Sequence, residues 1–523
     1  MTAKQLGALG MLARLARDFG PFLHTPITVE QAGEIVKHRL ETRAERFLLM
    51  VKQMIYSHAR SPYLRLLRAA GCDYGDLKAL VVQEGVEGAL SRLADTGVYV
   101  TFDEFKGRKA AVRGSERFDF AEEDFDNPHV SSHYEVRSGG SRGPGTSVKV
   151  NLSFVSDLAV NTALAFHSHG LTRHDHVIWL IAGVTPMLIY AKLARPPIAW
   201  FYPVRRLPFQ IWAGSRYLAA WGRLASSPLP TPAFLDLMDA GEMAVRLAAW
   251  VRRGKLLCVT TYASSAVRIA DAAKARGIAL EGVCFITLGE PFTEAKQRII
   301  AASGGRVLVR YGITEAGNIG YNCGTPQWPD DIHLFYDCYG LIQRRRSVGT
   351  SDLGVDAFLF TSLRRSAPKI LLNVESGDYG IVERKGCGCE LGALGLTTHL
   401  RRIRSFEKLS SEGMTFVQTN LLWILEEVLP ARFGGTSADY QVLEEEEEGI
   451  LRLSLTVSPT IGPVDEARVR ETLLDELGKD GAFARMGARM WRRAETVRVR
   501  RQWPVATRAG KILPFHLRER KGN

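Results

Sequence analysis

The chain has 523 residues, 46% hydrophobic and 24% charged, which is long enough for two to four domains of ordinary globular composition. Its formal charge of +12 favours anionic partners of nucleotide size or an acidic protein. The basic residues are spread along the chain without a zinc-finger, homeodomain or RNA-recognition signature, which argues against nucleic acid as a partner.

The cysteines and the hydrophobic segments bear on the compartment. Seven cysteines, an odd number without a regular framework, indicate a reducing compartment, and we expect the cytoplasm. The N-terminal segment is amphipathic but lacks the apolar core and cleavage site of a signal peptide. The most hydrophobic window, 177–194, is interrupted by Gly183, Thr185 and Pro186. We therefore predict a buried strand, turn and helix there, and no membrane span.

The first 385 residues divide into two patterns. Residues 1 to about 110 repeat apolar residues at helical spacing and predict a charged helical lead-in region. From about 145 to 385, β-rich runs alternate with helical ones, as in KLLCVTTY before SSAVRIADAAKARG and GVCFITLG before EPFTEAKQRIIAASG. This alternation predicts an α/β fold with a doubly wound, mostly parallel sheet. Ligands of such sheets lie outside the carboxyl ends of the strands, which places the loops TTYASS, TLGEPF and RYGITEAG along one edge.

After about residue 405 the pattern restarts as a small α+β unit of two helices and two strands. We therefore predict a large N-terminal domain, 1–404, and a small C-terminal domain, 405–523. The five consecutive glutamates at 444–448 are predicted to form a solvated hairpin turn between the two strands.

The strand-end loops carry groups suited to a nucleotide. A turn after one strand, where the backbone can lie against a flat heterocycle, contains Gly289, Glu290 and Pro291. In the loop after the next strand, Tyr311 offers an aromatic face and Gly312 permits a close approach of the backbone. Thr314 offers a hydroxyl, and Glu315 offers a carboxylate suitable for Mg²⁺.

Three further segments complete the candidate site. Asp378, in the turn ESGDYG, can accept hydrogen bonds from both ribose hydroxyls, and Lys511, in AGKILP, offers a point charge for phosphate or carboxylate. The stretch RSGGSRGPG is either a plain loop or an anion-binding turn of backbone N–H groups. Its candidate phosphate ligands are Ser138, Gly139, Gly140, Ser141, Arg142 and Gly143.

These segments together resemble the adenylate-forming superfamily of acyl-CoA synthetases, and most closely its phenylacetate–CoA ligase branch. The resemblance extends over most of the chain, through SPYLRLLRAAG, TFDEFKG, SGGSRGP, GEPFTEAKQRIIAASGGRVLVRYGITE, ESGDYG and AGKILP in the family's order. It implies that ATP and a carboxylic acid form an acyl-adenylate, and that the acyl group then passes to a thiol of coenzyme A or a carrier protein.

The resemblance also implies residue roles. Lys511 would bridge the carboxylate and the α-phosphate, Arg404 would bind ribose or phosphate, and the small C-terminal domain would then rotate. The sequence departs from the family in the phosphate loop, at Gly140, Ser141 and Arg142, and in the hinge, where Phe406 and Glu407 replace two acids. Aromatic residues suggest an aryl or other flat acid, with a pocket lined by Tyr202, Phe209, Tyr262 and Ala263.

A structural zinc site is a further expectation. One Cys-x-Cys pair, one more cysteine and one histidine make a sufficient Cys₃His set, namely Cys323, His333, Cys387 and Cys389. Similar positions occur in the phenylacetate–CoA ligase branch. Four protein ligands would leave no open position for catalysis.

Other functions remain open at this stage. A relative that passes the activated group to a non-thiol acceptor fits the altered loop and hinge. A non-catalytic nucleotide-binding scaffold is disfavoured, because it would not need Thr314, Glu315, Asp378 and Lys511 together. A self-acylating acyl-protein synthetase is disfavoured because no cysteine follows Cys389. The particular acid and the oligomeric state, a homodimer included, are left undetermined.

Overall fold

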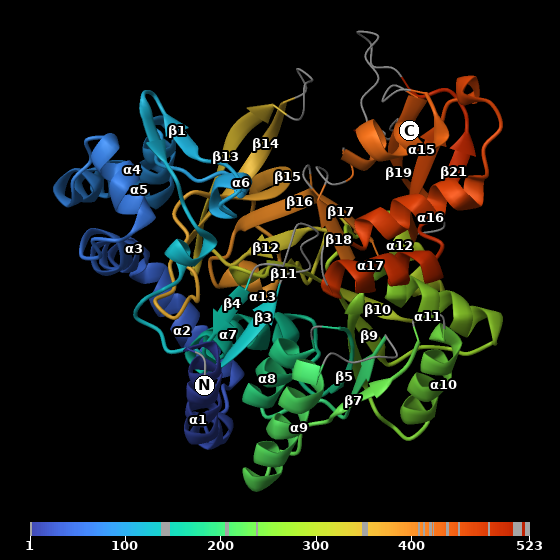
Figure 1. Cartoon of the computed structure of the whole chain (residues 1–523). Coiled ribbons are helices and arrows are strands. Elements are labelled where there is room, and N and C mark those ends of the chain that lie inside the picture. The colour runs from blue at the N-terminus through green and yellow to red at the C-terminus, as the bar shows by residue number, and fades with distance from the viewer. Residues whose placement is uncertain are drawn as a thin grey trace.

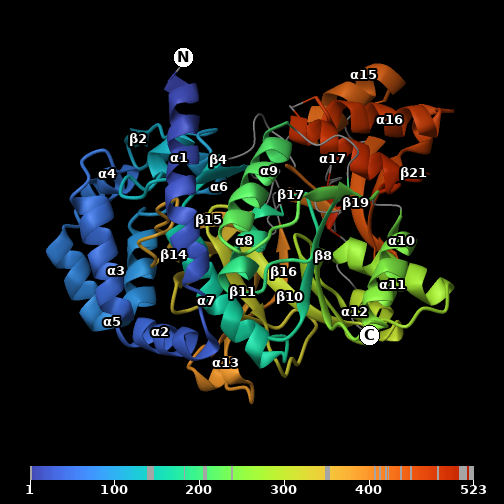
Figure 2. The same cartoon turned by 90° about the horizontal axis from the view of Figure 1, so that it is seen from below.

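The structure is a computed structural model of the whole chain, seen from two sides in Figures 1 and 2. A large body contains the N-terminal and central parts of the chain, and a smaller orange-to-red body lies on one side of it. The structure describes residues 3–137, 147–181, 183–203, 209–236, 239–347, 354–405, 408–411, 414–417, 421, 423–435, 439–447, 450–479, 482–505 and 515–517.

The first hundred residues are helical, as predicted. Capping boxes at Thr28 and Asp73 begin two of the helices, because each cap side chain accepts a backbone N–H of the first turn. The helices are α1 (Ala3–His24), α2 (Val29–Glu41), α3 (Arg43–Val51), α4 (Pro62–Ala69), α5 (Tyr74–Asp95) and the short α6 (Phe102–Phe105).

The large body is built on a twelve-stranded sheet whose second half in space is parallel. In spatial order its parallel strands are β10 (Arg306–Ile313), β9 (Val283–Leu288), β8 (Leu257–Tyr262), β5 (Asp175–Trp179), β6 (Ala199–Tyr202) and β7 (Pro232–Phe234). All six residues of β8 are buried, as expected for a strand covered on both faces. This half confirms the predicted strand–helix alternation.

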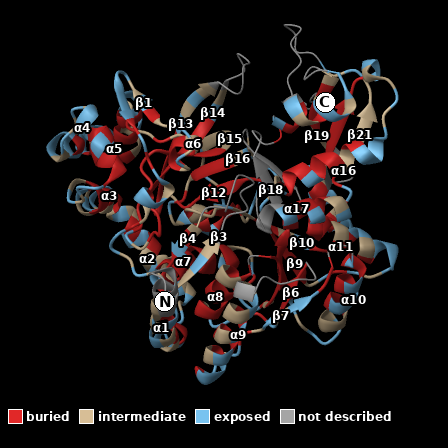
Figure 3. Ribbon diagram, in the orientation of Figure 1, coloured by how far each residue is buried: buried red, intermediate tan, exposed pale blue. Residues whose placement is uncertain are grey.

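Helices alternate with these strands. They are α7 (Leu152–Ser168), α8 (Val184–Lys192), α9 (Phe209–Leu224), α10 (Ala240–Val251), α11 (Ala263–Ala275) and α12 (Glu294–Ala302). Figure 3 shows the sheet as the buried centre, with the exposed positions on the outer helices. The apolar window 177–194 forms β5, a turn and α8, and within the described residues no helix is long and apolar enough to cross a bilayer.

The other half of the sheet is antiparallel, which the sequence patterns did not predict. From β10 outward it contains β11 (Gly317–Asn322), β12 (Ile332–Leu334), β16 (Thr398–Ser405), β15 (Val374–Arg384), β14 (Gly354–Ser362) and β13 (Tyr339–Ser347). The β10–β11 hairpin is tight: a Cβ at Gly312 would lie 2.5 Å from the carbonyl oxygen of Gly317. Two small hairpins, β1 (Ala111–Arg113)–β2 (Glu116–Phe118) and β3 (Tyr134–Arg137)–β4 (Ser147–Val150), stand beside this sheet.

The smaller body is an α+β unit, as predicted. Its four-stranded sheet has the order β21 (Val497–Arg501), β20 (Ile450–Val457), β19 (Tyr440–Glu447) and β22 (Phe515–Leu517). The helical elements are η3 (Ile424–Val428), α15 (Leu429–Phe433), α16 (Glu466–Leu477) and α17 (Ala482–Arg493), and a hairpin of β17 (Lys408–Ser411) and β18 (Met414–Val417) precedes them.

The glutamate run corrects one prediction. Glu444 to Glu447 belong to strand β19 and pair with β20 instead of forming the turn. Arginines on β21 explain this, because Arg500 contacts both Glu445 and Glu447 at 3.0 Å. Strand β20 lies between β19 and β21, so these ion pairs reach across it and stabilise the acidic run in its extended conformation.

Helix α17 docks the smaller body on the carboxyl end of the parallel strands. The Tyr202 hydroxyl, at the end of β6, donates to Met486 Sδ at 3.7 Å. An ion pair of 2.7 Å joins Arg493 to Asp236. Figures 1 and 2 both show α17 next to α16 in the smaller body.

Candidate active site

The three predicted loops lie along one edge of the sheet. Strands β8 and β9 are parallel and in register, with Tyr262 opposite Leu288, and β9 pairs in the same sense with β10. Their carboxyl ends therefore lie side by side. Gly289 has φ +79°, a conformation that favours glycine, and its Cβ position lies 3.4 Å from the Tyr262 ring.

Glu290 ties two of these loops together. Its carboxylate accepts the backbone N–H and the hydroxyl of Ser264, both at 2.9 Å, at the beginning of α11. A carboxylate is stabilised there by the unpaired N–H groups and the dipole of the helix. Next to it, the Pro291 carbonyl accepts from the buried Lys296 ammonium at 2.6 Å. Both contacts fix the backbone of the loop in which the sequence predicted nucleotide binding.

The structure brings Tyr311 and Asp378 together, although 67 residues separate them. The Tyr311 hydroxyl donates to Asp378 Oδ2 at 2.8 Å. Burial, reinforced by the Asp378 carboxylate, raises the pKa of Tyr311 well above its usual value, so the phenol is a proton donor. This contact orients the carboxylate that the sequence assigned to ribose.

Strand β16 runs beside the Asp378 turn. Ser405, its last residue, lies opposite Asp378, and its hydroxyl donates to the Gly377 carbonyl at 3.0 Å. Arg404 is opposite Tyr379, with its guanidinium 3.9 Å from Asp330. Arg404, predicted to bind ribose or phosphate, is thus one residue from the strand's end, next to the turn that contains Asp378.

Glu315 pairs with a residue that the sequence analysis did not assign. Thr314 and Glu315 lie in the turn between β10 and β11, and the Glu315 carboxylate contacts the Lys106 ammonium. The Lys106 side chain is only 7% exposed and lies within 5.6 Å of the Phe102 and Phe105 ring centroids. The segment TFDEFKG, already part of the family resemblance, was the available signal for this lysine.

Three of the residues predicted to line the acid pocket lie where β6 and β8 end. Tyr202, Tyr262 and Ala263 are buried there, and Met486 of α17 covers Tyr202. Burial raises the pKa of Tyr202 and of Tyr262, so both phenols stay protonated. Phe209 begins α9, and its side chain is not among those described.

Several predicted residues lie outside the described part of the chain. They are Lys511, the hinge residues Phe406 and Glu407, and the loop residues Ser138, Gly139, Gly140, Ser141, Arg142 and Gly143. The two ends of that loop are nevertheless fixed, because Arg137 and Ser147 face each other at the end of the β3–β4 hairpin.

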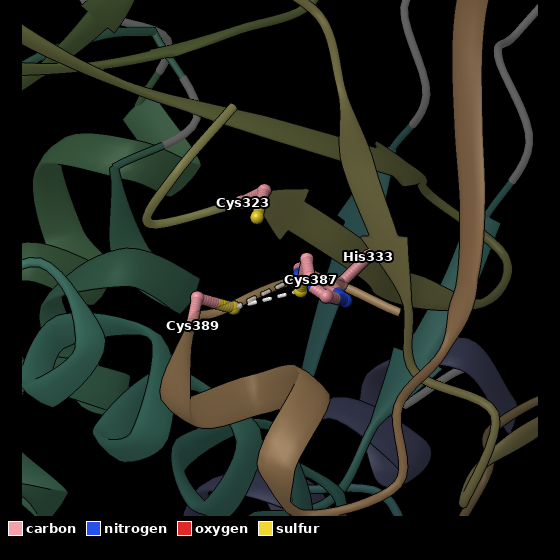
Figure 4. Close-up of side chains that lie close together, drawn as sticks. All are labelled: Cys323, His333, Cys387 and Cys389. Carbon is pink, nitrogen blue, oxygen red and sulfur yellow. Dashed lines mark hydrogen bonds between the residues drawn. The ribbon is translucent and has the colours of Figure 1, made fainter. Parts of the chain in front are cut away.

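The four predicted zinc ligands converge (Figure 4). Cys323 follows β11, His333 lies on β12, and Cys387 and Cys389 precede the short helix α13 (Glu390–Ala393). One ligand atom from each residue lies within 4.8 Å of those of the other three. The Cys387 and Cys389 sulfurs are 3.4 Å apart, close to the roughly 3.8 Å expected for two thiolates on a tetrahedral zinc at about 2.3 Å.

Neighbouring groups favour the metal-binding forms of His333 and Cys389. His333 Nδ1 lies 2.6 Å from the Leu396 carbonyl, so this nitrogen carries the proton and Nε2 remains as a ligand atom. Nε2 lies 3.1 Å from the Cys389 sulfur. The hydrogen bond from Cys323 lowers the pKa of the Cys389 thiol, which favours the thiolate that binds metals. The donor set therefore fits zinc.

Comparison with solved structures finds proteins of similar fold. No protein-family model and no curated protein sequence matches the chain. Its fold aligns with 2-hydroxyisobutyryl-CoA ligase in complex with 2-HIB-AMP and CoA in the thioesterification state, at 14% identity and a TM-score of 0.54. The alignment covers 94% of this chain and 91% of that one.

Two weaker alignments involve CoA synthetases. An acyl-CoA synthetase (AMP-forming)/AMP-acid ligase II-like protein from Dyadobacter fermentans aligns over 72% of this chain and 87% of its own, at 13% identity and a TM-score of 0.30. Acetoacetyl-CoA synthetase from Streptomyces lividans aligns over 77% and 55%, at 14% identity and 0.33. The fold assignment rests on the first match alone: the chain has the mixed α/β fold of 2-hydroxyisobutyryl-CoA ligase.

Proposed function

We propose that the protein is an AMP-forming acid–thiol ligase of the phenylacetate–CoA ligase type, acting on an aryl or other flat carboxylic acid. The observation that carries the proposal is the contact between Tyr311 of β10 and Asp378 of β15, at the sheet edge where the loop after the parallel strand β9 also begins. The fold shared with a CoA ligase supports it.

The proposed reaction has two steps. A carboxylate oxygen of the acid attacks the α-phosphorus of ATP, the bond between the α-phosphorus and the bridging oxygen breaks, and pyrophosphate leaves. The sulfur of the thiol then attacks the acyl carbon, and AMP leaves with the electron pair of the broken carbon–oxygen bond. Both steps require positioning and neutralisation of phosphate charge more than acid–base groups.

The residues of this edge divide that work. Asp378, oriented by Tyr311, would accept the ribose hydroxyls, and the backbone at Gly289 would lie against the adenine. The loop 138–143 would hold the triphosphate, Arg404 a phosphate or ribose oxygen, and Thr314 another phosphate oxygen. Lys511 would bridge the acid and the α-phosphate, after which the domain 405–523 would rotate about Phe406 and Glu407.

Magnesium and zinc have separate places in the proposal. The Glu315 carboxylate is a suitable oxygen ligand for Mg²⁺, which would neutralise phosphate charge when it is bound with ATP. Structural zinc would be held by Cys323, His333, Cys387 and Cys389, and would fasten the loop after β11 to the segment before β16.

All seven cysteines are free thiols in the structure, which supports the cytoplasm as the compartment.

A panel of carboxylic acids tests the proposal, with pyrophosphate release measured in the presence and absence of coenzyme A. We expect at least one acid to release pyrophosphate, and CoA to accelerate turnover. Pyrophosphate without a CoA effect would favour a carrier protein or a non-thiol acceptor. No release with any acid would refute the enzymatic assignment.

Substitution of the terminal lysine gives a second test. Lys511→Ala should abolish acid-dependent ATP–pyrophosphate exchange, because the charge that aligns acid and α-phosphate is lost. Lys521→Ala removes the same charge from the same terminal segment and should keep the exchange. Equal exchange in the two variants would remove Lys511 from the mechanism.

A further inference from the structure

Helix α17 presents two different faces. Met486 and Arg493, two turns apart, contact Tyr202 and Asp236 of the large body. Arg485, Arg489 and Arg492 repeat at intervals of four and three residues, so they form a separate stripe along the helix. The arginine stripe therefore runs along α17 beside the residues that contact the large body at the carboxyl ends of the strands.

A groove between α16 and α17 carries this stripe on its rim. Its volume is about 390 Å³, within the range of pockets that bind small molecules. The small residues Gly478 and Ala488 face each other in the groove, since a Cβ at Gly478 would lie 3.3 Å from the Ala488 Cβ. The cationic groups around them belong to Lys479, Arg485, Arg489 and Arg492.

The charge of this groove is only partly balanced. Arg492 contacts Glu471 and Asp475 of α16 at 2.5 and 2.8 Å, and Lys479 contacts Glu476 at 2.6 Å. Arg485 and Arg489 are exposed, and the described part of the chain provides neither with an ion pair or a side-chain hydrogen bond. One turn apart on the same face, they leave two guanidinium forks available to a single anion.

We propose that the α16–α17 groove binds the phosphate groups of the nucleotide end of coenzyme A, a proposal that rests on the thiol-transfer step above. Guanidinium forks match phosphate oxygens in a bidentate way and bind them more tightly than neutral donors do. A phosphate held by Arg485 or Arg489 lies within about one helical turn of Met486, which covers the end of β6. The thiol end of the same molecule can then enter between the two bodies.

The double variant Arg485→Gln/Arg489→Gln tests this site. We expect the KM for CoA to rise at least about tenfold, the loss expected from removing one or two charge-assisted hydrogen bonds. With pantetheine as the acceptor, which has no nucleotide phosphates, the variant and the wild type should react at the same rate. Acid-dependent ATP–pyrophosphate exchange involves no thiol, and it should be retained.

A matched control removes the same charge elsewhere. Arg252 and Arg253 are exposed after α10, and Arg252→Gln/Arg253→Gln should leave the KM for CoA unchanged. Equal increases in the two double variants would show a general charge effect and overturn the proposal. An increase that persists with pantetheine would overturn it as well, since the phosphates would then have no part in the effect.

Direct binding separates this proposal from the proposed function. In calorimetry with adenosine 3′,5′-bisphosphate, the wild type and the control should bind and the groove variant should bind at least about tenfold more weakly. Retained binding in the groove variant, or no binding to the wild type, refutes the groove even where the acid panel shows activity. Binding lost only in the groove variant supports it, whichever acid is activated.

Discussion

The contact between Lys106 and Glu315 allows a quantitative test of the candidate site. Lys106→Met keeps a long apolar side chain between Phe102 and Phe105 but leaves the Glu315 carboxylate without this partner. Glu315→Gln removes the carboxylate charge instead, and the double variant replaces both charges with neutral groups. These four proteins form a double-mutant cycle.

The expected magnitude follows from the burial of the pair. Two unit charges about 4 Å apart attract each other by about 4 kcal/mol near a protein surface, and removing one member of a buried pair costs about 3–5 kcal/mol. Because the side chains of Lys106 and Glu315 are 7% and 14% exposed, residual solvent screens the interaction. We therefore expect Lys106→Met to lower the free energy of unfolding by about 3 kcal/mol, with a coupling energy of about 2 kcal/mol.

Urea unfolding followed by tryptophan fluorescence measures the cycle. Lys109→Met is the matched control, since Lys109 is exposed on the same loop and should change stability by less than about 0.5 kcal/mol. Mg²⁺ should restore part of the loss in Lys106→Met, and none in the double variant, which has no carboxylate. A coupling energy below about 0.5 kcal/mol would refute the reasoning, because the two charges would then not stabilise each other.

Three other predictions concern separate parts of the molecule. Cys389→Ser should lower the zinc content, measured by elemental analysis, from about one equivalent per chain to a small fraction, and it should reduce the melting temperature. Cys72→Ser should change neither quantity. A wild-type protein that is folded but contains no zinc would contradict the site. Burial lowers the pKa of His176 to about 3, from a value near 6.5 in the unfolded chain. Between these pH values the unfolded chain binds one more proton, so acidification lowers the free energy of unfolding by up to about 1.4 kcal/mol per pH unit. In His176→Phe the urea midpoint should depend less steeply on pH, and an unchanged dependence would contradict this. Tyr311→Phe should raise the KM for ATP about tenfold in the exchange assay with little change in kcat, because Asp378 loses the donor that orients it; an unchanged KM would count against the ribose role of Asp378.

The parallel half of the fold was predictable because its sequence pattern is local. The runs KLLCVTTY and GVCFITLG are apolar without alternation and are each followed by a helical repeat, and they form β8 and β9 with their helices. The antiparallel half was not predicted, because the sequence of a strand does not show whether the strand pairs with its neighbours in the parallel or the antiparallel direction. The register of β15 beside β16 depends on contacts across the sheet.

The candidate site was predicted to a similar extent. The Cys-x-Cys pair, together with similar positions in the phenylacetate–CoA ligase branch, indicated the zinc set, and Cys323, His333, Cys387 and Cys389 do converge in the structure. Glu290 was assigned to the nucleotide, and its contact with Ser264 depends on how α11 packs beside β9. Lys106 lies 209 residues from Glu315, so the segment TFDEFKG could single out this lysine but not its partner across the fold.

The hydrogen bond from Ser405 to the Gly377 carbonyl has a mechanical consequence. It fastens the final residue of the large sheet to the turn that contains Asp378. Whatever pulls on the chain beyond Ser405 therefore acts directly on the backbone next to that carboxylate. If Asp378 holds the ribose as proposed, the Ser405 hydroxyl and the Gly377 turn couple the occupancy of that position to the orientation of the small body.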